Sequence, residues 1–190
     1  MSIVCAAIKN GVVAISSDTQ TSYGSLNVSA THIKNSGKLY AIKRSVIGVV
    51  GWRAMTDVLE HLMINDKELF QLDNRMDIFA TLLKLQQKMK DEYFIDTTED
   101  GDQPVESNQL TDMIVNKHGI FQIGSYREVN QYNTCWAIGS GKRLGLGAMH
   151  GLYNTNVSAK RIVEAGVRAA AEYDDSCSLP LNTRTVKLVR

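Results

Sequence analysis

Excess charge, paired cysteines and long apolar runs are all missing from this chain of 190 residues. Its three cysteines, Cys5, Cys135 and Cys177, lie far apart without a CxxC pair. This spacing argues against a disulfide framework or a zinc site and favours free buried thiols in a reducing compartment. No apolar run approaches the roughly 18 residues that span a bilayer, and no signal-peptide pattern is present. We therefore expect a cytoplasmic protein without membrane contact.

The charge and the glycine-rich segments exclude further classes of protein. A formal net charge of +1 leaves no electrostatic footprint for nucleic acid. The segment "GSGKRLGLG" contains Gly141-Lys142, but Arg143 follows where a P-loop needs Ser or Thr, and the segment does not fit the dinucleotide pattern GxGxxG. No GxSxG elbow or metal motif occurs. We expect no cofactor and no bound metal.

Turn signals and periodicity predict strands and helices in separate groups. Asn10-Gly11 is a strong hairpin signal between two apolar strands, and Ser158 is a suitable N-cap for a later helix. The predicted strands cover residues 3–8, 12–17, 38–42, 45–50, 134–138 and 183–190, with a hairpin over 110–124 that turns at 116–119. The predicted helices cover residues 54–63, 76–89, 142–153 and 159–173. The segment between residues 18 and 31 is predicted as loop or a short edge strand, and the acidic segment 96–109 as an exposed loop.

This order of elements predicts an α+β fold in one domain over residues 1–190. Strands come in hairpin-linked groups and helices in consecutive pairs, unlike the strict alternation of a βαβ protein. We expect a four-layer αββα sandwich, in which two stacked antiparallel sheets are flanked by helix pairs.

Polar residues at the strand ends are the strongest candidates for chemistry. If Met1 is removed, Ser2 carries both a hydroxyl and an α-amine, and an α-amine titrates at about 7.7–8.0. It can therefore act as a general base toward the hydroxyl of its own residue. The first hairpin returns Asp18 to the neighbourhood of Ser2, and Lys34 follows sixteen residues later.

Several spaced motifs resemble the proteasome β-subunit family, especially the bacterial HslV-type peptidases, which are N-terminal-nucleophile hydrolases. They are the early segment "KNGVVAISSDTQTSYGS", a lysine after a loop, "WAIGSG" and "YDDSCS". The resemblance covers nearly the whole chain and implies the N-terminal-nucleophile hydrolase fold. Family members place an aspartate 16 and a lysine 32 positions after the nucleophile, which corresponds to Asp18 and Lys34 here.

The resemblance also implies roles for individual residues. Ser2 supplies the nucleophilic oxygen, Lys34 is the nearby ammonium, and Asp18 holds Lys34 in place. The backbone N–H of Gly48 faces the developing oxyanion. The supporting residues are Ser140, Asp175 and Ser178. Apolar residues near Gly48 would line the specificity pocket, which favours cleavage after hydrophobic side chains.

The family further implies a homo-oligomer of two stacked rings that encloses the nucleophile, admits unfolded polypeptide and works with an ATP-dependent unfoldase. The usual nucleophile of the family is threonine, and serine lacks the methyl group that restricts χ1. Activity depends on the removal of Met1. The alternatives are a catalytically inactive ring or scaffold subunit that retains Met1, and a small-molecule amidohydrolase that works as a free subunit.

Overall fold

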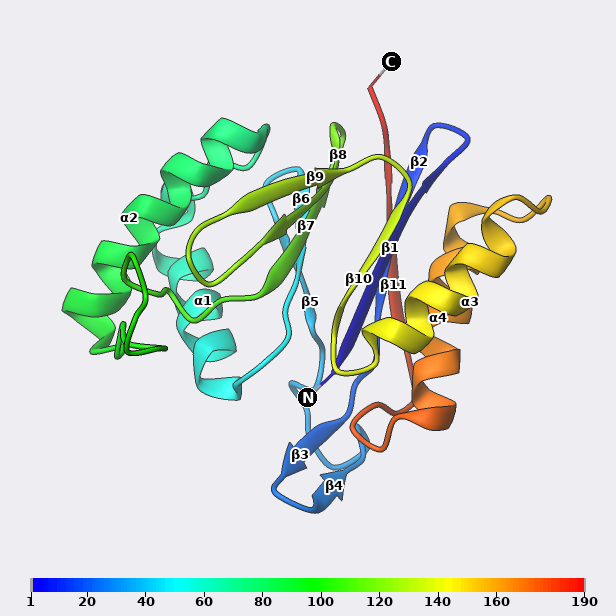
Figure 1. Ribbon diagram of the computed structural model, residues 1–190, viewed down its shortest axis with the longest axis horizontal. Helices are drawn as coiled ribbons and strands as arrows, with labels where there is room; N and C mark the ends of the chain where they lie inside the picture. Colours follow the sequence, from blue (N-terminus) through cyan, green and yellow to red (C-terminus); the bar gives the residue numbers. More distant parts are fainter. Residues whose placement is uncertain (1, 190) are drawn as a thin grey trace.

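A computed structural model describes residues 2–189 as a four-layer arrangement of helices and sheets (Figure 1). The strands are β1 (Ile3–Lys9), β2 (Val12–Ser17), β3 (Thr21–Tyr23), β4 (Leu26–Val28), β5 (Leu39–Ile42), β6 (Ser45–Gly48), β7 (Asp112–Asn116), β8 (Gly119–Ile123), β9 (Val129–Tyr132), β10 (Cys135–Gly139) and β11 (Asn182–Lys187). The helices are α1 (Arg53–Asn65), the short 3₁₀ helix η1 (Lys67–Leu69), α2 (Arg75–Tyr93), α3 (Lys142–Tyr153) and α4 (Ala159–Tyr173).

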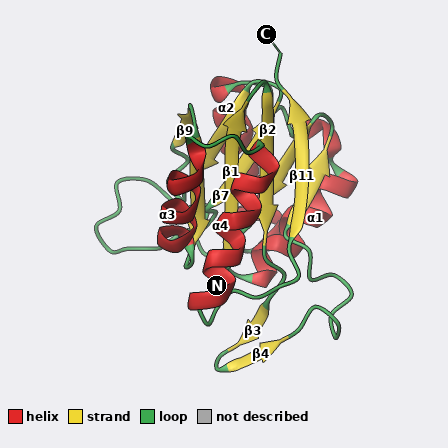
Figure 2. Ribbon diagram, turned by 90° about the vertical axis from the view of Figure 1, so that its right-hand side faces the viewer, coloured by secondary structure: helices red, strands yellow, loops and turns green. Residues whose placement is uncertain are grey.

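All strand pairs are antiparallel, as the separate grouping of strands and helices predicts. One sheet has the order β10-β1-β2-β11 and the other the order β5-β6-β7-β8-β9, while β3 and β4 form a separate two-stranded ribbon. Helices α1 and α2 cover the outer face of the five-stranded sheet, and α3 and α4 cover the four-stranded sheet (Figures 1 and 2). The expected αββα sandwich is confirmed.

Strand β1 shows why this stacking is stable, because both of its faces are buried. Ile3 and Cys5 point toward α3 and α4, while Val4 and Ala6 point toward the other sheet. Successive side chains of a strand face opposite ways, so an apolar run without polar alternation fits only a strand covered on both sides. The start of β1 is therefore fixed between the two sheets.

The helix boundaries follow local signals. The side chain of Ser158 accepts a hydrogen bond from the backbone N–H of Arg161 at 3.3 Å, which confirms the predicted cap of α4. A Cβ on Gly145 of α3 would lie 2.7 Å from Ile3 and 3.0 Å from the sulfur of Cys5. Glycine at this position therefore permits α3 to pack closely on β1.

The remaining predictions of turns, loops and strands agree with the structure, with one exception. The hairpin turn at Asn116–Gly119 is confirmed, and residues 96–109 are mostly exposed and contain no helix or strand, as expected. The sequence did not predict β9, because its alternating residues are mostly polar or exposed. Within residues 2–189, no helix is both long and apolar enough to cross a membrane.

Candidate active site

The predicted nucleophile lies where the β1–β2 hairpin, the end of β10 and the segment after α4 meet. Ser2 is 4% exposed and immediately precedes β1. The hairpin register pairs Val4 with Ser17, so the next residues, Ile3 and Asp18, lie opposite each other. The backbone N–H of Ile3 donates to Asp18 Oδ1 at 3.0 Å. The hairpin therefore brings Asp18 to the backbone of the residue that follows Ser2.

Asp18 is fully buried and holds a lysine, but that lysine is Lys38. Lys38 Nζ donates to Asp18 Oδ1 at 2.7 Å, and the backbone N–H of Gln20 donates to Asp18 Oδ2 at 3.0 Å. Lys38 is 9% exposed and immediately precedes β5. Burial lowers the pKa of Lys38 from its usual value, and the charge of Asp18 acts in the opposite direction.

The expected pairing of Asp18 with Lys34 is wrong. Lys34 is exposed and lies four positions before Lys38, in the irregular segment ahead of β5. The backbone of Lys38 is fixed instead, because its carbonyl accepts a hydrogen bond from the N–H of Val49 at 3.0 Å, just after β6. A count from Ser2 that assumes the same loop length as in the family therefore stops four residues short of the buried ammonium.

The prediction that Gly48 lies beside the nucleophile is also wrong. Gly48 lies within β6, and a Cβ there would be 2.7 Å from Val4 and 2.9 Å from Ile15, in the core between the sheets. Gly51, three residues later, lines both pockets that contain Ser2. It has a positive φ of 104° and open space at its Cβ position. Gly51 replaces Gly48 as the glycine beside the candidate nucleophile.

On the other side of Ser2, the turn between β10 and α3 contacts its backbone. Ser140 Oγ donates to the carbonyl oxygen of Ser2 at 3.3 Å. A Cβ on Gly139, which has a φ of +96°, would lie 2.1 Å from the same oxygen. The sequence prediction that places Ser140 near Ser2 therefore agrees with the geometry.

The expected pair Asp175 and Ser178 is displaced by one residue. Asp175 is exposed, and its backbone carbonyl rather than its side chain accepts hydrogen bonds from Gln20 and Asn27 at 2.8 and 3.1 Å. Ser178 takes part through its backbone, because its carbonyl oxygen accepts a hydrogen bond from the N–H of Thr19 at 3.4 Å.

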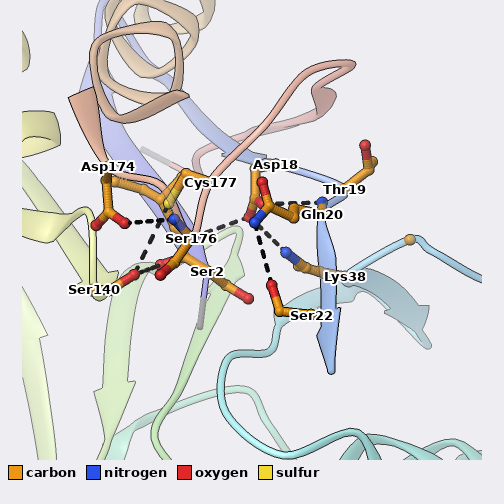
Figure 3. A network of polar contacts seen from close by, with 12 residues as sticks. Ser2, Asp18, Thr19, Gln20, Ser22, Lys38, Ser140, Asp174, Ser176 and Cys177 are labelled. Atoms are coloured by element: carbon orange, nitrogen blue, oxygen red, sulfur yellow. Dashed lines mark hydrogen bonds and ion pairs between the residues drawn. The ribbon is translucent and has the colours of Figure 1, made fainter. Parts of the chain in front are cut away.

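Asp174 and Cys177 are separated by three positions, as Asp175 and Ser178 are, and they lie close to Ser2 and Ser140 (Figure 3). Asp174 Oδ1 accepts from the N–H of the buried Ser176 at 2.9 Å, and the sulfur of Cys177 lies 4.0 Å from Ser140 Oγ. Burial raises the pKa of the Cys177 thiol to about 12, so it stays protonated near neutral pH. In the same view Lys38 and Asp18 lie on the other side of Ser2.

Two pockets meet at Ser2. The smaller has a volume of about 80 Å³ and is lined by Lys38, Arg53 and several hydroxyl or amide side chains, together with Val49 and Val50. The larger has a volume of about 400 Å³ and is lined by both polar and apolar groups, including Trp52, Glu99 and Lys142. The pocket walls combine polar and apolar groups in similar measure, so cleavage after hydrophobic side chains stays a prediction.

Within the part of the chain that the structure describes, no group of three or more His, Cys, Asp or Glu side chains could hold a metal ion. Cys5, Cys135 and Cys177 are free thiols.

The two stacked antiparallel sheets, with a nearly buried serine at the start of a central strand, define the N-terminal-nucleophile hydrolase type of sandwich. The proteasome subunit family model matches residues 1–189. The chain belongs to the proteasome subunit family.

Solved structures agree with this assignment. The chain is 29% identical to the BPH protein of Thiobacillus denitrificans in complex with epoxomicin, with a TM-score of 0.91, 99% of this chain covered and 100% of that chain. A second structure of the BPH protein of Thiobacillus denitrificans gives 29% identity, a TM-score of 0.91 and 98% of each chain covered. Eukaryotic HslV from Trypanosoma brucei shares the fold at 16% identity, with a TM-score of 0.75, 97% of this chain covered and 99% of that chain. No curated protein sequence is significantly similar to the chain.

Proposed function

We propose that the chain is a subunit of a peptidase that hydrolyses peptide bonds with Ser2 as its N-terminal nucleophile after removal of Met1. The observation that carries this proposal is the position of Ser2, nearly buried where two pockets meet and beside the buried pair of Asp18 and Lys38. A BPH protein of 29% identity forms a complex with epoxomicin. This similarity supports binding of the same kind of compound by this chain.

The reaction then divides into acylation and deacylation. Ser2 Oγ attacks the peptide carbonyl carbon, and its proton passes to the α-amine of Ser2, directly or through one water. The C–N bond breaks, the leaving amine takes that proton, and Ser2 holds the acyl group as an ester. A water molecule next attacks the ester carbonyl carbon and gives one proton to the α-amine of Ser2. The C–O bond to Ser2 breaks, that proton passes to Ser2 Oγ, and the carboxylic acid product leaves.

The neighbouring residues lower the barrier to these steps. The Lys38 ammonium favours the ionised form of the hydroxyl, because an opposite charge within about 4–6 Å stabilises a developing anion. Asp18 keeps Lys38 in place through the 2.7 Å contact. The backbone N–H of Gly51 is the donor we assign to the oxyanion, an interaction whose loss typically costs about 3–4 kcal/mol. Ser140 supports the backbone of Ser2, while Asp174 holds the neighbouring Ser176 and Cys177 lies beside Ser140.

We further propose that the protein acts in the cytoplasm as a homo-oligomer of stacked rings, cleaves unfolded polypeptide and works with an ATP-dependent unfoldase. Large apolar side chains on and beside the α1–α2 layer are exposed in the single chain, which supports contacts between subunits there. They are Trp52, Ile64, Met76 and Phe94.

Hydrolysis of an unfolded, fluorescently labelled polypeptide tests this function. We expect Ser2→Ala to abolish hydrolysis and to leave the assembly size unchanged, since the hydroxyl contributes chemistry and little packing. Ser2→Thr is the matched variant, and its restricted χ1 should keep or raise the rate. Equal hydrolysis by the wild type and Ser2→Ala would rule out Ser2 as the nucleophile. No hydrolysis by the wild type would favour the inactive scaffold alternative with Met1 retained.

A further inference from the structure

A buried carboxyl group lies close to the site but outside the groups assigned to the reaction. Asp112 begins β7 and is 1% exposed. It lines a narrow internal cavity between the five-stranded sheet and helices α1 and α2, whose other lining residues are apolar apart from Thr81. Asp112 Oδ2 has no hydrogen-bond partner within the described residues 2–189. An isolated polar group of this kind is costly to bury, so a packing role alone does not explain an acid here.

One polar group near the carboxyl leads to the active site. The backbone N–H of Val50 lies near the Asp112 carboxyl group and favours its charged form. The register of β6 and β7 explains the contact, because Gly48 pairs with Met113 and the chain leaving β6 therefore passes beside Asp112. Val50 immediately precedes Gly51, and both residues line the two pockets at Ser2.

We propose that Asp112 is a positioning residue: its buried carboxylate binds the N–H of Val50 and thereby holds Gly51 in the orientation that presents its own N–H beside Ser2. The inference rests on the proposed function for the role of Gly51, but the contact with Val50 exists independently of catalysis. The segment 49–52 connects β6 to α1 and has no regular secondary structure, so an anchor from the neighbouring strand restricts it directly.

The strength of this anchor depends on pH. Burial raises the pKa of Asp112 from its usual 3.8 to about 7, and the nearby backbone N–H of Val50 limits the rise. The groups that β6, β8, α1 and α2 contribute around the carboxyl carry no charge, for example Ile47, Ile123 and Leu59. Glu99 and Lys142 line the larger pocket on the side of Val50 and not the cavity of Asp112. A carboxylate is a stronger acceptor than a protonated carboxyl group, so the anchor tightens as the pH rises through about 7.

Hydrogen exchange of the Val50 and Gly51 amides tests the proposal on the full-length protein without requiring catalysis. Asp112→Ala removes the acceptor, and Leu85→Ala is the matched control, because Leu85 is buried in the same cavity on α2. We expect the Val50 amide to exchange at least about tenfold faster in Asp112→Ala, corresponding to 1.4 kcal/mol, and at the wild-type rate in Leu85→Ala. Equal acceleration in both variants would overturn the proposal.

Asp112→Asn decides the matter even if Asp112→Ala does not fold, because it keeps an acceptor and removes the titration. In the wild type, protection of the Val50 amide, corrected for intrinsic exchange, should rise several-fold from pH 6 to pH 8. In Asp112→Asn it should stay constant. An identical rise in both proteins would refute the role of Asp112.

Hydrolysis by the same proteins separates this inference from the proposed function. We expect Asp112→Ala to lower kcat by about tenfold or more with little change in KM, since the oxyanion is absent from the ground state. If neither the wild type nor any variant hydrolyses polypeptide, the assignment of Ser2 as nucleophile fails. The hydrogen-exchange rates would still test the contact between Asp112 and Val50. If the wild type is active and Asp112→Ala keeps its full kcat, the positioning role fails instead.

Discussion

Replacing Lys38 with alanine tests the central electrostatic contact of the site. Asp18 is completely buried and Lys38 nearly so, with 2.7 Å between Lys38 Nζ and Asp18 Oδ1. Removing one partner of a buried ion pair leaves the other charge uncompensated, which costs about 3–5 kcal/mol. Asp18 keeps hydrogen bonds from the backbone N–H groups of Ile3 and Gln20. We therefore expect a loss at the lower end, about 3 kcal/mol.

Lys34→Ala is the matched control, because Lys34 is an exposed lysine in the segment just before Lys38. Its loss should change the free energy of unfolding by less than about 0.5 kcal/mol. Urea unfolding at equal protomer concentration measures both variants, because assembly makes stability depend on concentration. A loss of about 3 kcal/mol lowers Tm by about 6–12 °C in a chain of this size. Hydrolysis should disappear in Lys38→Ala and persist in Lys34→Ala; similar losses in the two variants would refute the assignment of Lys38.

Three further predictions concern the interior, strand β6 and the segment after it. Asp112 binds its proton more tightly in the folded chain, with a pKa of about 7 against a usual 3.8, so its contribution to stability is fully present below about pH 4 and is lost as the pH rises through 7. Relative to Asp112→Asn, the wild type should lose about 3 kcal/mol of unfolding free energy between pH 5 and pH 8, and parallel pH curves in urea unfolding would contradict this. Gly48→Ala should overpack the core against Val4 and Ile15 and cost about 1–3 kcal/mol, while preserving kcat per folded molecule. A Cβ in Gly51→Ala meets no atom, but the residue is strained at its φ of +104°. Gly51→Ala should therefore lower kcat and change Tm little. If instead Gly48→Ala lowers kcat per folded molecule and Gly51→Ala does not, Gly48 would be the glycine of the site.

The sequence predicts the fold well because several local signals agree with one another. The Asn10-Gly11 turn sets the register of β1 and β2, and that register alone places Asp18 beside the backbone of Ile3. The separate grouping of strands and helices identifies the sandwich, and Ser158 marks the start of α4. Strand β9 was missed because only Val129 is buried within it.

The site is harder to predict because its residues come from irregular segments of variable length. Lys38 rather than Lys34 reaches Asp18, and only its place at the start of a predicted strand could have pointed to it. Either glycine of "GVVGW" fits the motif by sequence, and the packing of Gly48 against the core decides between them. The doubled acid in "YDDSCS" allows two alignments at the same spacing, and the turn geometry selects Asp174.

Asp112 gives no signal in the sequence. An acid before an apolar strand is ordinarily a solvated residue, and only the three-dimensional structure shows that α1 and α2 cover it. Its connection to the site likewise depends on the pairing of β6 with β7, which lie far apart in the sequence.

Mass spectrometry of the purified protein after reaction with epoxomicin tests the central claim most directly. We predict that the chain has lost the mass of Met1 and that one inhibitor molecule is attached, mapped by peptide sequencing to Ser2. Ser2→Ala, treated in the same way, should carry no inhibitor. Retention of Met1 together with an unmodified Ser2 in the wild type would contradict the assignment of Ser2 as the nucleophile.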